Sequence, residues 1–428
     1  MVLPRSMDLP ESLRGQAVRI QGLARSAGLD FPEIDFRLLD ARDVNAVAAY
    51  GGFPVRYPSW RFGMDFERLE KTYQYGLSRI YELVINTDPV VAYLVRTNSH
   101  LEQKLVIAHV CGHADFFKHN SWFAATDRGM LARMGWHATL VRRAMDEEGQ
   151  DRVEEFLDLA LSLETLIDPY LPLRERLAGE RRRELAPPTY DVLGFLAAHA
   201  PLEVWQRNLL EMVRSEAYYF QPQRMTKIMN EGWASFWHAR LLTGGVLEDS
   251  EVVDFADCHS GATADSPGRV NPYKLGIELF RAAERQGLDI FRLRRVHNDA
   301  SLIDLLVDAE FVLRQKLFLY GANAKTGRTE VVERDPGRVK AKLMQDLSWG
   351  GLPQIELVTV GEAEPRGLCL LHHHDGRDLD LDAARATLLC IERLWQAPVR
   401  LSTHESGEPR RLVARNGATT TEDCVPAA

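Results

Sequence analysis

The sequence predicts an α+β protein with a mainly α-helical core and a small α+β domain at its C-terminal end. Three observations lead there: apolar residues recur at helical spacing over most of the first 314 residues, one β-rich pair of segments interrupts them, and strand-like segments return after about residue 315. The expected division is a helical segment over 1–50, a core over 51–314, a small domain over 315–415 and a disordered tail over 416–428.

The N-terminal part is expected to be helical over residues 5–50, because Leu13, Val18, Ile20 and Leu23 recur at helix-like spacing. A loop rich in Gly and Pro follows over 51–58, and a further helix is expected over 65–81.

A β-hairpin is predicted next. Residues 82–85 and 90–95 are rich in β-branched and aliphatic side chains, and the Asn-Thr-Asp-Pro sequence between them supplies turn chemistry. Asn98 or Ser99 is then placed to cap a helix over 100–118.

The remaining elements follow from the same patterns. Helices are expected over 126–148, 150–168, 201–219, 223–243, 274–287, 337–347 and 382–395. Strands are expected over 316–320, 329–332, 354–360 and 367–373, and a Gly-, Ser-, Asp- and Pro-rich loop over 258–273.

The charge balance argues against a general role in binding nucleic acid or anionic membranes. The chain of 428 residues carries 52 basic and 61 acidic side chains, a net charge of −9. It has no apolar run near the ~20 residues of a membrane span, and its N-terminus lacks the apolar region of a secretion signal. The five cysteines are scattered without a CxxC pair, which favours a cytoplasmic location and argues against a thiolate zinc site.

The first candidate for chemistry is a pair of histidines, His109 and His113, within a predicted helix. Four positions apart, their imidazoles lie on one helix face, one turn apart, which suits a shared divalent metal ion. Histidines at this spacing also occur in purely structural roles, so a second segment is needed.

The second candidate is the segment Asn230-Glu-Gly-Trp-Ala-Ser-Phe-Trp-His238. Glu231 and His238 are seven positions apart and share a helix face. The small residues Gly232 and Ala234 would let this helix approach another closely. A tightly packed aromatic helix with a paired glutamate is the structural alternative.

Together the two segments resemble the zinc-ligand helices of the gluzincin metallopeptidases, in which HExxH supplies two histidines and a later helix supplies a glutamate. The resemblance implies His109, His113 and Glu231 as ligands of a divalent metal ion such as zinc. The predicted hairpin occupies the place of the substrate-binding edge strand in those enzymes. Two departures stand out: Val110 replaces the general-base glutamate, and Glu231 follows His113 by 118 positions.

Other polar residues could replace the missing base. His238 and His259 are the strongest candidates for catalytic residues, followed by Glu82 at the start of the hairpin, and all three rank above Glu102. Asp115 follows His113 by two positions and therefore lies on a different helix face.

A di-iron carboxylate site is disfavoured, because it calls for a Glu-x-x-His motif on each of two helices and the chain lacks such a pair. The run His372-His373-His374-Asp375-Gly376 is typical of a charged turn, with adventitious metal binding as the alternative. Asn271-Pro272 is expected to begin a helix. No Walker, GxSxG or GxGxxG motif supports a nucleotide, serine-hydrolase or Rossmann function.

The chain also resembles the SpoVR-like proteins, relatives of stage V sporulation protein R. Five stretches carry the resemblance, which spans about residues 51–380: 76–94, 104–120, 227–240, 271–276 and 374–380. The valine between the two histidines is part of the pattern of that family.

The resemblance implies a cytoplasmic bacterial protein connected with the peptidoglycan of the spore cortex, or with stress and developmental control. It implies a PrkA-type serine kinase and a YeaH-type protein as partners. Three hypotheses follow: a regulatory protein with a metal site, a metal-dependent hydrolase acting on a cell-wall amide or peptide, and a metal-free scaffold for the kinase complex.

Overall fold

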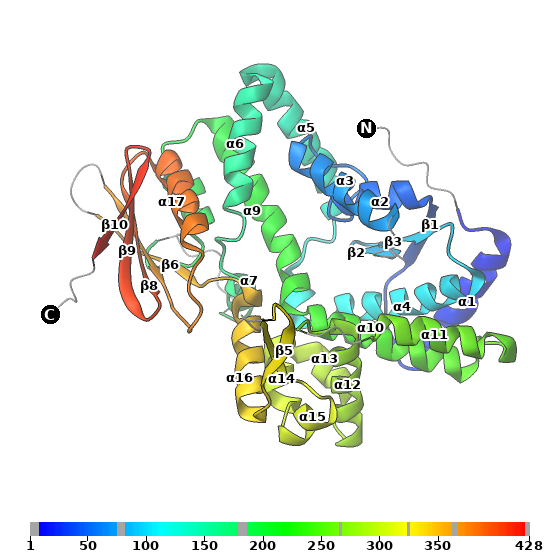
Figure 1. Cartoon of the computed structure of the whole chain (residues 1–428). Helices are drawn as coiled ribbons and strands as arrows, with labels where there is room; N and C mark the ends of the chain where they lie inside the picture. Colours follow the sequence, from blue (N-terminus) through cyan, green and yellow to red (C-terminus); the bar gives the residue numbers. More distant parts are fainter. Residues whose placement is uncertain are drawn as a thin grey trace. The chain divides into compact units, whose positions relative to one another are not determined.

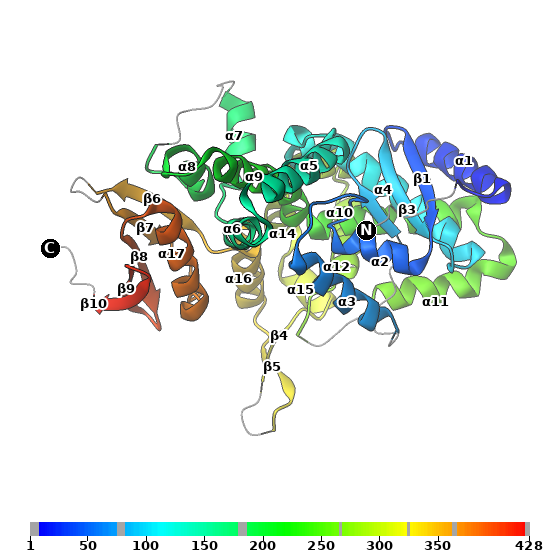
Figure 2. The same cartoon turned by 90° about the horizontal axis from the view of Figure 1, so that it is seen from above.

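The computed structural model describes residues 8–74, 82–178, 186–264, 268–322, 326–361 and 366–423. The chain folds into two compact units (Figures 1 and 2). The first comprises residues 1–138 and 222–347, and the second 139–221 and 348–428. Each unit therefore combines two stretches of sequence, whereas the sequence led us to expect contiguous domains; those boundaries stay a prediction.

A small sheet opens the first unit. In the described residues it has the order β1-β3-β2, from strands β1 (Ile34–Leu39), β2 (Glu82–Ile85) and β3 (Val90–Val95). β2 and β3 pair antiparallel, which confirms the predicted hairpin. β1 pairs parallel to β3, with Ile34 opposite Val90.

The helical prediction for residues 5–50 is wrong over β1. Helices α1 (Glu11–Ser26) and α2 (Ala41–Ala49) flank this strand. Ile34, Phe36 and Leu38 of β1 are buried at every second position, the period of a strand. The partner strand begins some fifty residues later, so local spacing did not reveal the pairing.

Helix α4 (His100–His119) lies on this sheet, on the side away from α2 and α3 (Trp60–Gln74) in Figure 1. The predicted cap at Ser99 is confirmed: its side chain accepts a hydrogen bond from the backbone N–H of Glu102, and the Glu102 carboxylate accepts one from the N–H of Ser99. This reciprocal capping box fixes the start of the helix that carries both histidines.

Helix α10 (Lys227–Leu241) packs between α4 and α12 (Pro272–Arg285). The unit also contains α13 (Ile290–Val296), α14 (Asp299–Leu306), α15 (Ala309–Arg314), α16 (Pro336–Leu347) and the hairpin of β4 (Leu319–Ala322) and β5 (Thr329–Glu333). The expected loop over 258–273 is wrong for its first residues, because α11 (Val252–Ala262) continues through His259.

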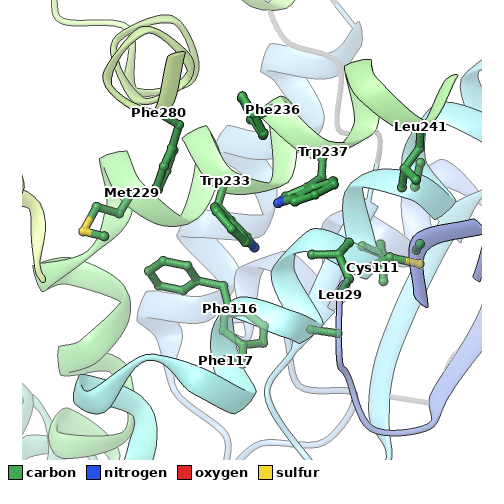
Figure 3. Close-up of a cluster of buried hydrophobic side chains, with 14 of the residues drawn as sticks. Leu29, Cys111, Phe116, Phe117, Met229, Trp233, Phe236, Trp237, Leu241 and Phe280 are labelled. Carbon is green, nitrogen blue, oxygen red and sulfur yellow. The ribbon is translucent and has the colours of Figure 1, made fainter. Parts of the chain in front are cut away.

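Aromatic side chains fill the interface between α4, α10 and α12. Figure 3 shows Trp233 and Trp237 of α10 turned toward α4, with Phe116 beside Trp233. The ring of Trp233 also meets that of Phe280 on α12 edge to face, with ring centroids 5.0 Å apart. Such burial of large apolar rings is the main stabilising contribution in this core.

A buried polar network crosses the same interface. Asp115 is fully buried and accepts hydrogen bonds from Nε1 of Trp233 and from the backbone N–H of Asp30. Its carboxylate also lies 3.4 Å from Nε of Arg294, which is itself buried. Asp115, which follows His113 by two positions, therefore has a structural role: it links α4 to α10 and α13.

The second unit combines helices with a mixed sheet. In the described residues the sheet has the order β10-β9-β8-β7-β6, and α17 (Leu381–Trp395) packs on it. Its strands are β6 (Ile355–Val360), β7 (Leu368–His372), β8 (Val399–Glu405), β9 (Glu408–Arg415) and β10 (Ala418–Asp423). β7 and β8 run parallel and are connected through α17.

The disordered tail expected over 416–428 is wrong for residues 418–423, because β10 pairs with β9 throughout its length. Residues 424–428 lie outside the described part.

The helices of this unit include α6 (Gln150–Ser162), α7 (Leu171–Ala178) and α8 (Val192–His199), while α5 (Met130–Glu148) and α9 (Val204–Met225) each extend across a boundary between the units. In the described stretches of the chain, no helix combines the length and the apolar character needed to span a membrane.

Candidate metal centre

His109, His113 and Glu231 come together at the contact between α4 and α10. The Oε2 atom of Glu231 lies 3.5 Å from Nε2 of His109 and 3.6 Å from Nε2 of His113. The two imidazole rings meet edge to face, with centroids 4.5 Å apart. Among the described residues, this is the one group of His, Cys, Asp and Glu side chains whose ligand atoms converge closely enough to hold a metal ion.

The spacing fits an ion better than direct hydrogen bonds. Ligands that coordinate a tetrahedral zinc ion at about 2.0–2.2 Å lie roughly 3.3–3.6 Å from one another. An N–H···O hydrogen bond is shorter, at about 2.7–3.2 Å. Glu231 Oε2 is also buried and has no hydrogen-bond partner among the described residues. A buried carboxylate oxygen aimed between two imidazoles is the donor set that a divalent cation needs.

Two of the three side chains, His113 and Glu231, are held in the protonation states that bind metal. Burial, and next the neighbouring His109, lowers the pKa of His113 to about 4. Burial alone would raise the pKa of Glu231, but contacts with the two histidines and a hydrogen bond from Tyr273 hold it below its ordinary value. At neutral pH the site therefore offers a neutral imidazole and an ionised carboxylate, the forms that bind metal.

Close helix packing sets the distance between these three side chains. A Cβ added to Gly112, next to His113, would lie 2.6 Å from Cα of Ala234 on α10. Only glycine permits this approach, which brings the backbone of α4 against the helix that carries Glu231.

Each of the two histidines has a hydrogen-bonding partner on its other nitrogen. Nδ1 of His113 lies 2.9 Å from Oδ1 of Asn230, and Nδ1 of His109 lies 2.9 Å from Nδ1 of His238. His238 continues the chain, because its Nε2 lies 3.1 Å from Nδ1 of His259 on α11. Such outer partners orient ligand imidazoles in metalloproteins.

The sequence-predicted catalytic residues are thus partly brought together. His238 and His259 lie in one hydrogen-bonded chain that reaches His109 on the nitrogen facing away from Glu231. Glu82 begins β2, where its backbone pairs with Leu94, but its side chain lies outside the described part. Their catalytic roles stay predictions. Val110 is fully buried in the hydrophobic core.

Sequence reasoning missed two residues of this site, Asn230 and Tyr273. Asn230 directly precedes Glu231, so an inspection of polar neighbours of the glutamate would have found it. Tyr273 hydrogen-bonds to Glu231 from the first turn of α12, where Asn271 caps the helix through its side chain. Only the packing of α12 against α10 brings Tyr273 here.

The histidine run of the second unit has structural partners. His372 bonds Thr403, His373 bonds Glu356 and His374 bonds Asp378, each through a ring nitrogen. Asp375 pairs with Arg377 in the turn that follows. The predicted charged turn is therefore confirmed, and these histidines are distributed over separate partners.

Comparison with known proteins assigns the family. The family profile described as "SpoVR like protein" matches residues 9–186 and 173–352, and the profile described as "SpoVR-like C-terminal domain" matches residues 353–406. The chain belongs to the SpoVR-like family. The candidate metal centre of this SpoVR-like protein lies wholly within the first profile, and β6, β7 and β8 lie within the second.

A curated relative extends this similarity to a named bacterial protein. The SpoVR-like chain is 32% identical over 284 residues to "Uncharacterized protein YcgB" of Escherichia coli (strain K12). The matched region covers 55% of this chain and 56% of the relative, so it spans little more than half of that protein. No solved structure matches the chain.

Proposed function

We propose that this SpoVR-like protein binds one divalent metal ion through His109, His113 and Glu231 and uses it to hydrolyse an amide or peptide bond. The observation that carries the proposal is the convergence of Glu231 Oε2 on Nε2 of both histidines, at 3.5 and 3.6 Å. Two histidines and one glutamate form a ligand set of catalytic zinc sites, which leave the remaining position open to water or substrate.

A bound ion of this kind would lower the pKa of a water molecule and polarise a carbonyl group. The residues of the chain would hold the ion, with Glu231 supplying the negative charge. Tyr273, which hydrogen-bonds to Glu231, would orient that carboxylate and leave its Oε2 directed between the histidines.

The arrangement supports a gluzincin-like metal site in which a residue at another position replaces the general-base glutamate. The hairpin β2–β3 precedes the histidine helix, and the glutamate comes from a later helix, as that resemblance implies. With Val110 buried, the proton acceptor has to be another residue. His238 and His259 reach His109 on the side facing away from Glu231, so of the three candidates we propose Glu82. The chemistry of an amide hydrolase fits a substrate from the cell wall, such as a peptide of peptidoglycan.

A cellular role is proposed on the family resemblance alone. It is a regulatory function in spore cortex formation or in stress and developmental control, in the cytoplasm, with a PrkA-type serine kinase and a YeaH-type protein as partners. Co-purification of the chain with each purified partner tests the two interactions.

The metal proposal is tested by elemental analysis and zinc titration of the purified protein. We expect about one ion per chain in the wild type and a loss of that ion in the double variant His109→Ala/Glu231→Ala. Equal metal contents in the two proteins would reject the site. A folded, metal-free wild type that still binds the partners would favour the scaffold hypothesis.

The hydrolase proposal has its own readout. Release of free amino groups from peptidoglycan-derived peptides should require zinc and should disappear in Glu231→Ala. Hydrolysis that survives both His109→Ala and Glu231→Ala would reject a role for this site.

A further inference from the structure

We propose that Asn230 and His238 are positioning residues that fix the two ligand histidines in the tautomer whose Nε2 carries the lone pair, and that His259 fixes His238 in turn. This inference rests on the metal site proposed above. It concerns where neutral imidazoles carry their single proton, so it calls for no change in charge.

The constraint comes from the imidazole ring itself. A neutral histidine has one N–H and one unprotonated nitrogen. The nitrogens of His109 and His113 that face Glu231 are both Nε2. If these atoms bind the ion, the proton of each ring must reside on Nδ1, and each Nδ1–H needs an acceptor.

For His113 the acceptor is Asn230. The carbonyl oxygen Oδ1 of Asn230 lies 2.9 Å from Nδ1 of His113, and an amide oxygen only accepts hydrogen bonds. The proton must therefore be on Nδ1, which leaves Nε2 with its lone pair. Since both side chains are buried, water competes little for this hydrogen bond.

For His109 the acceptor is another histidine, His238, whose own proton position depends in turn on His259. If Nδ1–H of His109 donates to Nδ1 of His238, the proton of His238 must be on Nε2. That Nε2–H then donates to Nδ1 of His259, 3.1 Å away, and the proton of His259 is on its own Nε2. In this arrangement His109 donates to His238 and His238 donates to His259, so every hydrogen bond in the chain points away from Glu231.

The opposite direction gives a site that does not bind metal. His259 would donate to His238, His238 would donate to His109, and the proton of His109 would be on Nε2, facing Glu231. His238 therefore decides whether His109 presents a lone pair or an N–H. Packing holds the chain of three histidines in place. The ring of Phe255 on α11 stacks on that of His259, with centroids 5.6 Å apart, and His238 is buried on α10.

A matched pair of substitutions at His238 separates acceptor chemistry from packing. His238→Gln keeps an oxygen that can accept from Nδ1–H of His109, whereas His238→Phe keeps a ring but offers no acceptor. We expect zinc affinity to fall by about 10- to 100-fold in the Phe variant and to be largely restored in the Gln variant. His119→Phe, the same change near the end of α4, serves as the control and should bind zinc like the wild type.

The proton positions are read directly from the ring ¹⁵N and ¹H signals of labelled histidines. Zinc-loaded wild type should show the Nδ1–H tautomer for His109 and His113, and His238→Phe should lose this pattern at His109. If the Phe variant does not fold, His259→Phe, at a partly exposed position, should give the same loss in weaker form.

Two results would overturn the inference. One is wild-type zinc affinity together with an unchanged His109 tautomer in His238→Phe. The other is a metal-free wild type in which His113 carries its proton on Nε2 despite Asn230. A wild type that binds no zinc, but in which His113 carries the proton on Nδ1, would reject the proposed metal function and leave the role of Asn230 standing.

Discussion

Gly232 of α10 and Gly276 of α12 are so close that a Cβ added to Gly232 would lie 2.3 Å from Cα of Gly276. Gly232 directly follows the candidate ligand Glu231, and Tyr273, which hydrogen-bonds to Glu231, lies on the same helix as Gly276. The close crossing of α10 and α12 therefore fixes the positions of both Glu231 and its hydrogen-bonding partner Tyr273.

Replacing Gly276 with alanine is expected to destabilise the protein and weaken metal binding together. The new Cβ would lie 2.2 Å from the carbonyl oxygen of Ile228, so the helices must separate and carry Glu231 with them. Overpacking of this kind costs about 1–3 kcal/mol. Denaturant unfolding and zinc titration measure the two effects. Gly15→Ala, where nothing lies within 4 Å of the added atom, should leave zinc affinity unchanged.

Zinc is expected to stabilise the folded protein through Glu231. A ligand present at 100 times its dissociation constant adds about 2.7 kcal/mol to the free energy of unfolding. Glu231→Ala should abolish this gain, because it removes the ligand oxygen that approaches both histidines. Glu310→Ala, an exposed glutamate paired with Arg314, is the matched control. The same zinc-induced rise in melting temperature in Glu231→Ala would count against the site.

Asp115→Ala is expected to be strongly destabilising, by about 3–5 kcal/mol, since it leaves the buried Arg294 without its carboxylate partner. It also removes the acceptor for Nε1 of Trp233. The comparison is Glu147→Ala on α5, which breaks an exposed ion pair with Arg143 and should cost about 0.5 kcal/mol or less. Equal unfolding free energies in the two variants would show that the network contributes little.

Acidification is expected to destabilise the second unit through His372. Burial, and next the neighbouring His374, lowers the pKa of His372 to about 4. The unfolded chain takes up this proton near pH 6.5, so the stabilising contribution is complete above that pH and is lost as the pH falls toward 4.

The variant His372→Asn, which can still bond Thr403 but does not titrate, should show a smaller loss of unfolding free energy between pH 7 and pH 4.5. Parallel pH curves for the two proteins would contradict the assignment to this residue.

Much of the local structure could be predicted from the sequence because its causes are local. The Ser99 cap, the turn between β2 and β3 and the helical periodicity of α4 and α10 each depend on residues within a few positions. The same holds for the shared face of His109 and His113, which follows from their spacing alone. Four strands were not predicted: β1, β8, β9 and β10. The partner of β1 begins some fifty residues later, so local spacing does not reveal it. The strands β8, β9 and β10 are joined by tight turns at Ser406-Gly407 and Asn416-Gly417, a local signal that was overlooked.

By itself, the sequence determined the residue types of the site and the helices that carry them. The resemblance to the gluzincin helices predicted that Glu231, 118 positions after His113, would join the two histidines. The tertiary structure alone decided that its Oε2 points between them and that Asn230, His238 and Tyr273 support them. The physical reason is the close approach of α4, α10 and α12 at glycines, which is a property of packed surfaces rather than of any one segment.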